Sequence, residues 1–240
     1  MLSKESLSAL GAMQRDEIYI CNLVVTASFI ADLDLHNFAR VVGGTYRPSK
    51  FAAVRFRVKH PKCTMLVFGS GKCVCIGCMS VGMAEAAINQ CFRQVCKITR
   101  TARISDISVQ NIVSHTNMKR RVDLLKMAKE NGLNTNYDPE LFPGLRMSLQ
   151  EQNARACIFF QGNVVVTGCK NFETLARVWS IVKKRTEPYT QHAVSTKEDT
   201  SPRQDPRFAP AHFDHLTHTA TSVTRQLDRL TYECEMEVCE

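Results

Sequence analysis

The chain has 240 residues, of which 44% are hydrophobic, so it can bury a substantial core, and it contains no run of the roughly 18 apolar residues that a membrane span needs. Its formal net charge of +8 is unevenly distributed, because residues 1–185 hold 26 Lys and Arg against 13 Asp and Glu, whereas residues 186–240 hold five against ten. A basic folded part favours a polyanionic partner, which charge alone does not identify as DNA, RNA or an acidic protein.

The N-terminal residues 1–16 are polar and mixed, which predicts a loose arm. They lack the pattern of a secretory signal, so we expect an intracellular protein. The eleven cysteines support this expectation, because an odd number in a chain without a secretory signal is typical of reduced thiols.

In the first half, residue patterning predicts a strand, a short helix, three strands and a long helix. The first strand covers residues 18–26, and Asp34 is expected to cap a helix that runs through Val42. Short connections favour antiparallel pairing of the next three strands, near residues 52–59, 64–68 and 73–76. Ser80 is expected to cap the long helix, whose apolar stripe should pack on the sheet through Ala84, Ala87, Ile88, Cys91 and Val95.

The second half repeats this order. We expect a strand over residues 107–113 and a basic helix over residues 118–131, closed by Gly132. Three strands follow near Leu145, Ala156 and Val165. A last helix should begin near Asn171 and face the core with Phe172, Leu175, Ala176, Trp179 and Val182, of which Trp179 is the expected anchor.

The repeated order reflects an internal duplication. Shifted by 91 positions, residues 46–78 match residues 137–169 at nine of 33 positions, where roughly two matches would be expected by chance. Upstream, residues 22–25 correspond to residues 111–114 at an offset of 89. Two copies of this length predict a pseudo-two-fold α+β molecule rather than a solenoid, which needs three or more short repeats.

These patterns divide the chain into an N-terminal arm (1–16), a first repeat (17–99), a second repeat (100–185) and an acidic C-terminal tail (186–240). The tail is rich in Thr, Pro, Ser, His and acidic residues, so residues 186 to about 212 should be disordered. A weak helix is expected around residues 223–232.

Two groups of side chains resemble metal ligands in their spacing. Cys73, Cys75 and Cys78 lack the paired Cys-x-x-Cys spacing of a zinc site, and the second repeat has Val164, Val166 and Cys169 in their places, which favours packing as small apolar side chains. The tail histidines His212, His215 and His218 are three apart but have no packed setting, so solvation is favoured. We therefore expect no metal and no cofactor.

Alternation in the third strand separates two faces of the sheet. Val54 and Phe56 point one way, whereas Arg55 and Arg57 point the other. If both long helices cover one face, the opposite face is exposed, apolar and flanked by cations, and it needs a partner. It would display Asn22, Val24, Val74, Ile76, Asn111, Val113, Val165 and Thr167.

Four phenylalanines form two duplicated pairs, Phe51 with Phe68 and Phe142 with Phe159. From spacing alone they are either ordinary core aromatics or wedges inserted between base steps, which unstack and bend DNA.

Several segments resemble the TATA-box-binding protein family in order, spacing and duplication. They are residues 51–54, 66–72, 110–113, 139–145 and 165–168, and the resemblance extends from residue 18 to about 185. It implies a saddle, in which a curved antiparallel sheet carries helices on its convex face and places its concave face in the minor groove of DNA.

Carried over residue by residue, the resemblance implies specific roles. The wedge pairs would be Phe51 with Phe68 and Phe142 with Phe159. Asn22 and Asn111 would contact base edges, with Thr167 beside them, and the groove floor would be met by Val24, Val74, Val113 and Val165. The phosphate contacts would be Arg57, Lys62, Ser70 and Lys72.

The same resemblance implies protein partners. Asp138, Glu140 and Leu141 match the surface loop that engages TFIIB-like factors, and TFIIA-like factors and the RNA polymerase machinery are further expected partners. Acidic residues beside a DNA wedge would repel phosphate, so protein contact explains them better.

The chain also departs from the family pattern. Ile76 replaces a threonine that Thr167 preserves, and Met79 stands where Lys170 would be expected. Asn163 replaces the lysine seen as Lys72, and Ser148 stands where a phosphate-binding arginine is typical. The second half should therefore hold DNA less firmly.

Together these features predict a general transcription factor that binds and bends DNA from the minor groove and nucleates preinitiation complex assembly. It would act in the nucleus, or in a viral transcription compartment if it is viral. The alternative is an adaptor that has lost strong DNA binding and recruits or sequesters TFIIB-like factors. An enzyme is not expected, because the sequence offers no paired acids in register, no nucleophile with a base and no phosphate loop.

Overall fold

A computed structural model of the chain describes residues 6, 8, 9, 11, 13, 16–99 and 102–191, apart from the side chain of residue 106. The chain separates into two compact units, Met1–Ala193 and Val194–Glu240, and all described residues lie in the first. The disorder predicted for residues 192–212, the helix predicted near residues 223–232 and the tail histidines lie outside the described residues.

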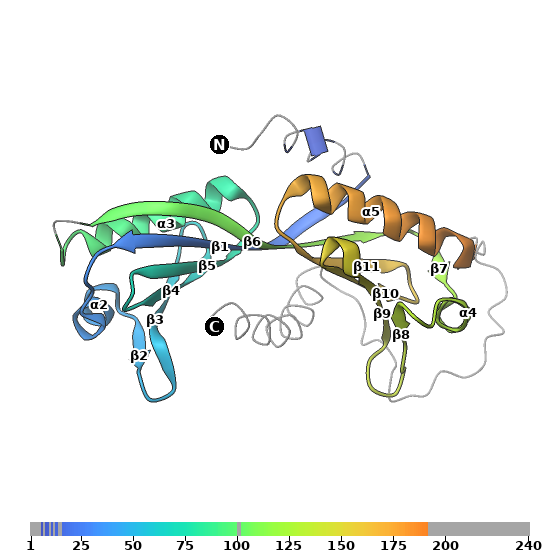
Figure 1. The fold of residues 1–240 in the computed structure, drawn as a ribbon, viewed down its shortest axis with the longest axis horizontal. Helices are drawn as coiled ribbons and strands as arrows, with labels where there is room; N and C mark the ends of the chain where they lie inside the picture. Colours follow the sequence, from blue (N-terminus) through green and yellow to red (C-terminus); the bar gives the residue numbers. More distant parts are fainter. Residues whose placement is uncertain are drawn as a thin grey trace. The chain divides into compact units, whose positions relative to one another are not determined.

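Ten strands form one antiparallel sheet, shown in Figure 1. In chain order they are β1 (Tyr19–Ile30), β2 (Thr45–Arg47), β3 (Phe51–Val58), β4 (Cys63–Phe68), β5 (Lys72–Cys78), β6 (Arg103–Asn117), β8 (Thr135–Asn136), β9 (Gly144–Leu149), β10 (Ala154–Phe159) and β11 (Asn163–Cys169). Their order across the sheet is β2-β3-β4-β5-β1-β6-β11-β10-β9-β8, so each half mirrors the other about the central pair. The duplication in the sequence is therefore a pseudo-two-fold relation in the fold.

The two central strands are longer than the sequence predicted. β1 and β6 pair antiparallel from Tyr19 opposite His115 to Ile30 opposite Arg103, with bulges along the way. This pairing joins the two repeats, because each central strand supplies the hydrogen-bond partners that the other half lacks.

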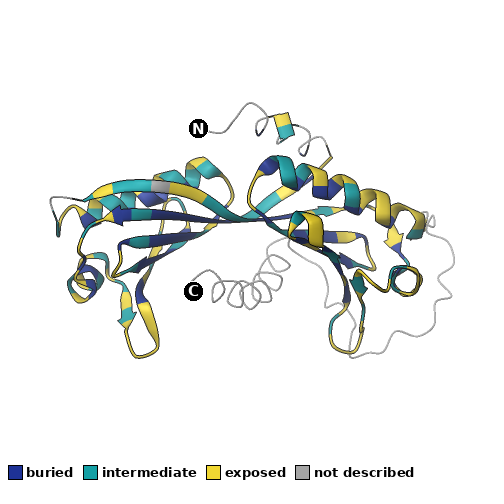
Figure 2. Cartoon of the chain, viewed as in Figure 1, coloured by how far each residue is buried: buried dark blue, intermediate teal, exposed yellow. Residues whose placement is uncertain are grey.

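Two long helices lie on the same face of the sheet (Figure 1): α3 (Val81–Val95) and α5 (Phe172–Thr186). Each begins as predicted, because the Ser80 hydroxyl accepts the Met83 N–H at 3.3 Å and the Asn171 side chain accepts the Thr174 N–H at 2.8 Å. The buried side chains of α3 are the predicted stripe: Ala84, Ala87, Ile88, Cys91 and Val95. Figure 2 shows buried residues along β1 and on parts of these helices, whereas most of β6 is intermediate or exposed.

The core lies between the helices and this face of the sheet. Trp179 on α5 is 5% exposed and its Nε1–H donates to the Ser114 hydroxyl on β6 at 3.0 Å, which confirms the predicted anchor and satisfies its polar atom. At the corresponding positions the first repeat has Ile88 and Val25, both fully buried. Figure 1 shows the sheet bending away from α3 and α5 toward both ends, so we call the opposite face the concave face.

Two short helices lie near the ends of the sheet. α2 (Leu35–Val42) is capped by Asp34 as predicted. α4 (Leu124–Glu130) is much shorter than the predicted helix over residues 118–131. Lys119 has a φ of 55°, in the left-handed region, so a helix does not run through it, and Asp123 caps the helix instead by accepting the Lys126 N–H at 2.9 Å.

Residues 186–191 are ordered, which corrects the prediction that disorder begins at residue 186. The 3₁₀ helix η2 (Glu187–Tyr189) leads into β12 (Thr190–Gln191), which pairs with β7 (Arg121–Val122). The Tyr189 hydroxyl donates to Glu130 at 2.8 Å and accepts from Asn131 at 2.9 Å. These long-range contacts hold a segment whose composition alone favours disorder.

The N-terminal arm also differs from the prediction of a loose segment, because its described residues 6, 8, 9, 11 and 13 are helical and residue 16 lies in a turn. Met13 is 3% exposed and belongs to the core, and the Ser6 hydroxyl donates to Glu173 at 2.6 Å. The sequence did not predict a helix here, because polar and apolar residues are mixed in this stretch without a clear helical spacing.

Candidate nucleic-acid interface

Strand alternation sends two sets of side chains to opposite faces of the sheet. Val54, Phe56 and Val58 of β3 pack in the main core, whereas Arg55 and Arg57 are exposed on the concave face, as predicted. The same alternation applied to each strand places all eight side chains predicted for this face on it: Asn22, Val24, Val74, Ile76, Asn111, Val113, Val165 and Thr167.

The centre of the concave face carries a duplicated asparagine. The Oδ1 atom of Asn22 accepts the Gly77 N–H at 2.8 Å, and the Oδ1 atom of Asn111 accepts the Gly168 N–H at 2.8 Å. Both glycines have a φ near +100°, a conformation that L side chains rarely adopt. Because each Oδ1 is held by a backbone donor, each amide is fixed with its NH₂ group on the other side.

The two asparagines differ in their neighbours. Asn111 also exchanges hydrogen bonds with the Thr167 hydroxyl at 3.2 Å. In the first repeat Ile76 occupies the position of Thr167, so Asn22 lacks this second contact. Both amides are therefore held, but the second is held more firmly.

Both predicted phenylalanine pairs form. The ring centroids of Phe51 and Phe68 are 5.8 Å apart with an interplanar angle of 66°, and those of Phe142 and Phe159 are 5.8 Å apart at 60°. Phe51 is 38% exposed and the other three rings are half-buried, so the four rings lie outside the main core. The pairs occupy equivalent places in the two repeats: Phe51 begins β3 and Phe68 ends β4, whereas Phe142 lies in the turn before β9 and Phe159 ends β10.

The part of the concave face that lies between the two phenylalanine pairs is less exposed than predicted. Val24, Val74 and Val113 are buried, at 8%, 7% and 3% exposed, whereas Val165 is half-buried. In the first repeat the reason is lateral packing: a second apolar cluster on the concave face contains Val24, Ala53, Leu66 and Val74, with Phe68 and Ile76 against it. The expectation that all of these side chains are exposed is therefore wrong.

The predicted phosphate contacts of the first repeat lie along or near its strands. Arg57, Lys62 and Ser70 are exposed, and Lys72 is half-buried on β5. The Ser70 hydroxyl accepts the Lys72 N–H at 3.5 Å. Ser70 and Lys72 lie near the Phe51 and Phe68 end of these strands, whereas Arg57 and Lys62 lie at the opposite end of β3 and β4.

The second repeat has neutral side chains at three of these positions. Ser148, Asn153 and Asn163 stand where the first repeat has Arg57, Lys62 and Lys72. Asn163 is moreover bonded within the protein, because its Oδ1 accepts from Asn117 Nδ2 at 2.7 Å.

Sequence reasoning missed a cation on this half. In β10, Ala154, Ala156 and Ile158 are buried in the core, so Arg155, Cys157 and Phe159 face the concave side. Arg155 is exposed and stands where the first repeat has Thr64. The alternation in β10 could have revealed it. Arg146, which corresponds to Arg55, lies with its guanidinium carbon 4.7 Å from the centroid of Phe142.

His115 is a second residue that sequence reasoning missed. It alternates with Asn111 and Val113 in β6 and stacks near Tyr19, with ring centroids 5.7 Å apart. His115 is exposed at the surface, but partial desolvation lowers the pKa of its imidazole from the ordinary value, which favours the neutral form.

The predicted protein-binding residues lie in the turn before β9. Asp138, Glu140 and Leu141 are all exposed, and Leu141 is 84% exposed. The Asp138 carboxylate accepts the Glu140 N–H at 3.1 Å and its carbonyl accepts the Phe142 N–H at 2.9 Å. The turn therefore exposes an apolar side chain directly after two acidic ones.

Comparison with known proteins places this geometry in a family. The family described as "Transcription factor TFIID (or TATA-binding protein, TBP)" matches residues 17–98 and 106–184. The chain is 35% identical over 171 residues to the TATA-box-binding protein of Dictyostelium discoideum, covering 68% of this chain and 83% of that protein. It is 32% identical over 172 residues to that of Schizosaccharomyces pombe, covering 71% and 74%.

The fold is also similar to the solved structure of the Methanococcus jannaschii TBP. The TM-score is 0.65 with 29% identity, and the match covers 71% of this chain and 98% of the other. These findings confirm the predicted fold class, a two-repeat α+β protein with a curved antiparallel sheet. The chain belongs to the TATA-binding protein family.

Proposed function

We propose that this protein is a general transcription factor that binds double-stranded DNA in the minor groove, bends it and nucleates preinitiation complex assembly. The observation that carries the proposal is the duplicated arrangement on one face, in which a phenylalanine pair flanks a fixed asparagine in each repeat. The family relatives, which are TATA-box-binding proteins by name, support it.

The fixed asparagines suit the edges of A·T base pairs. The minor groove of A·T pairs shows only acceptors, whereas a G·C pair adds the guanine amino group. Because Gly77 and Gly168 hold each Oδ1, the amides of Asn22 and Asn111 can present N–H donors to the bases. Val24, Val74, Val113 and Val165 would contact the groove floor, with Thr167 holding Asn111.

The phenylalanine pairs suit the two ends of a bent site. Apolar wedges inserted between base steps unstack them and bend the duplex, and TBP is itself a standard example of this behaviour. Because each repeat has one pair, the DNA would be kinked at two places, which are related by the pseudo-two-fold axis.

Cations around the face would neutralise phosphates. Arg57, Lys62 and Lys72 would serve this purpose in the first repeat, where the neutral Ser70 hydroxyl would hydrogen-bond a phosphate, and Arg155 adds a charge in the second. Each phosphate that is neutralised releases counterions, so affinity should fall steeply with salt.

The turn at Asp138, Glu140 and Leu141 would bind a TFIIB-like factor, because an exposed leucine beside acidic side chains fits a partner with an apolar pocket and a basic rim. TFIIA-like factors and the RNA polymerase machinery would join the same assembly, and the protein would act in the nucleus. Catalysis is not part of this proposal.

The test is DNA bending measured by fluorescence energy transfer across an A·T-rich duplex. Wild type should bend it, and Phe51→Ala with Phe68→Ala should lose most of the bend. Phe160→Ala is the matched control, because Phe160 follows Phe159 directly but is not part of either phenylalanine pair. Its ring instead contacts Arg121, whose guanidinium carbon is 5.6 Å from the ring centroid.

Salt titration completes the test. A plot of the logarithm of wild-type affinity against the logarithm of salt concentration should be a falling line with a slope of several units. Affinity that ignores salt, or bending that survives the double substitution, would overturn the proposal. Binding of a TFIIB-like protein without DNA bending would instead favour the adaptor.

A further inference from the structure

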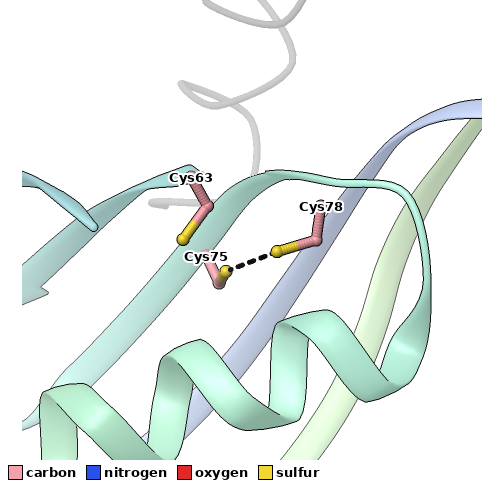
Figure 3. A group of neighbouring side chains, drawn as sticks. All are labelled: Cys63, Cys75 and Cys78. Atoms are coloured by element: carbon pink, nitrogen blue, oxygen red, sulfur yellow. Dashed lines mark hydrogen bonds between the residues drawn. The ribbon is translucent and has the colours of Figure 1, made fainter. Parts of the chain in front are cut away.

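Three cysteines of the first repeat converge in the core (Figure 3). Cys63 begins β4, and Cys75 and Cys78 lie in β5, and all three are buried. Their sulfur atoms lie within 4.8 Å of one another, and those of Cys75 and Cys78 are 3.6 Å apart. Cys73, which the sequence analysis grouped with Cys75 and Cys78, is not a member of this group.

The fold explains why these three side chains meet. β4 and β5 are antiparallel neighbours, with Met65 opposite Cys75 and Thr64 opposite Ile76, so the start of β4 lies beside the end of β5. Gly77, with a φ of +103°, separates Cys75 from Cys78 and has Cys63 Cα 3.6 Å from where its Cβ would stand. The sequence shows the spacing of Cys75 and Cys78, but only strand pairing brings Cys63 to them.

The second repeat provides an internal comparison. Ala154, Val166 and Cys169 occupy the positions of Cys63, Cys75 and Cys78, and all three are buried in the same kind of packing. Packing of this fold therefore does not require thiols at these places. Three thiols directed at one point are a property of the first repeat alone.

The arrangement matches the geometry of metal thiolates. Thiolates bind zinc at about 2.3 Å, so three sulfurs around one such ion lie about 4 Å apart, close to the observed separations. Soft thiolate ligands select Cu(I) and Zn(II) among common ions. Among the described residues no fourth His, Cys, Asp or Glu side chain joins the group, which favours three-coordinate binding.

We propose that Cys63, Cys75 and Cys78 form a three-thiolate site for one soft closed-shell metal ion, Cu(I) or Zn(II). Each thiol loses one proton to solvent on binding, three sulfur–metal bonds form, and no oxidation or reduction occurs. The site begins next to the exposed turn at His60 and Lys62, which gives an ion a short path inward. The ion links β4 to the end of β5, directly before α3, and so stabilises the first repeat.

The experiment uses the full reduced chain without oxygen, titrated separately with Zn(II) and with Cu(I) against a chromophoric chelator. The test variant is Cys63→Ala with Cys75→Val, which installs the residues of the second repeat and so preserves packing. The control is Cys73→Val, which removes another buried thiol of β5 and also installs its counterpart, Val164.

Wild type and the control should bind one tight equivalent that the test variant lacks, and the ion should raise their melting temperature but not that of the variant. X-ray absorption should show three sulfur neighbours at about 2.3 Å. A fourth, lighter neighbour with Zn(II) still supports the site, because zinc usually completes a tetrahedron.

Equal metal uptake by wild type and the test variant would overturn the proposal. Loss of the tight metal equivalent in the Cys73→Val control, to the same extent as in the test variant, would overturn it as well. If the double variant does not melt cooperatively, Cys75→Val alone serves in its place with the same expected loss. The outcome is independent of DNA binding, which is measured in parallel as a check that each variant is folded.

Discussion

The two repeats share one backbone arrangement and differ in the chemistry that they present. Both carry a phenylalanine pair with centroids 5.8 Å apart and an asparagine bonded to a glycine N–H at 2.8 Å. The first repeat also carries the cations Arg57, Lys62 and Lys72, whereas the second has Ser148, Asn153 and Asn163 in their places.

The comparison shows that the two repeats share the features that depend on backbone conformation but not the surface charges. The asparagine bond depends on a glycine in a left-handed conformation and on strand register, which both repeats need in order to fold. Phosphate contacts depend only on exposed side chains, which the fold does not constrain. We therefore expect an asymmetric grip on DNA, tighter at the first repeat.

The largest effect should come from the asparagines. Asn111→Asp keeps the acceptor for Gly168 but removes the N–H donor and brings negative charge to the base edges. We expect DNA affinity to fall by about 100-fold or more. Asn22→Asp should have a similar effect, measured by equilibrium binding to one duplex. Unchanged affinity in both variants would show that these amides do not face the bases.

Exchanging charges between repeats should have the next largest effect. Arg57→Ser with Lys72→Asn gives the first repeat the residues of the second. It should reduce the steepness with which log affinity falls against log salt concentration, here called the salt slope, by about two. Ser148→Arg with Asn163→Lys should raise it by about two. Melting temperatures report whether the variants are folded, and slopes that do not move would place these residues away from phosphate.

Arg155 should contribute a single contact. Arg155→Thr installs the first repeat's Thr64 and should lower the salt slope by about one. Glu151→Gln is the control, because this exposed charge lies in η1 (Gln150–Gln152) rather than in a strand of the concave face. A slope that stays constant in Arg155→Thr would mean that the second repeat lacks this contact.

A smaller effect is expected at Gly144, the counterpart of Ala53. A Cβ there would stand 2.8 Å from Phe142 Cε1 and 3.0 Å from Phe159 Cε1, so both rings must shift. Gly144→Ala should reduce affinity about fivefold, in line with an overpacking cost of about 1 kcal/mol, and change the bend at that end. Bending equal to wild type would show that the rings adjust freely.

The smallest effect concerns pH. Partial desolvation lowers the pKa of His115 below its value in the unfolded chain, so the folded state binds fewer protons there. Stability should be unaffected well above pH 6.5 and should decrease as pH falls through the unfolded and then the folded pKa. His115→Thr, which installs the first repeat's Thr26, should flatten the stability profile below neutral pH, measured by denaturant unfolding.

Local patterning was enough to predict much of the molecule. Asp34, Ser80 and Asn171 each cap a helix, and the buried stripe of α3 follows from helical spacing. These features depend on residues close in sequence, so they can be predicted without tertiary contacts. The helix predicted over residues 118–131 forms only over Leu124–Glu130, because Lys119 is left-handed, with a φ of 55°, and its N–H donates to the Asn117 side chain.

The duplication, the central asparagines and the aromatic pairs could be predicted from the residues alone, because each recurs at a fixed offset along the chain. Tertiary packing settled which side chains share a surface. It buried Val24, Val74 and Val113, placed Arg155 on the concave face, ordered residues 186–191 against β7 and brought Cys63 to Cys75 and Cys78. The reason is that register and long-range pairing join residues whose separation in the chain carries no local signal.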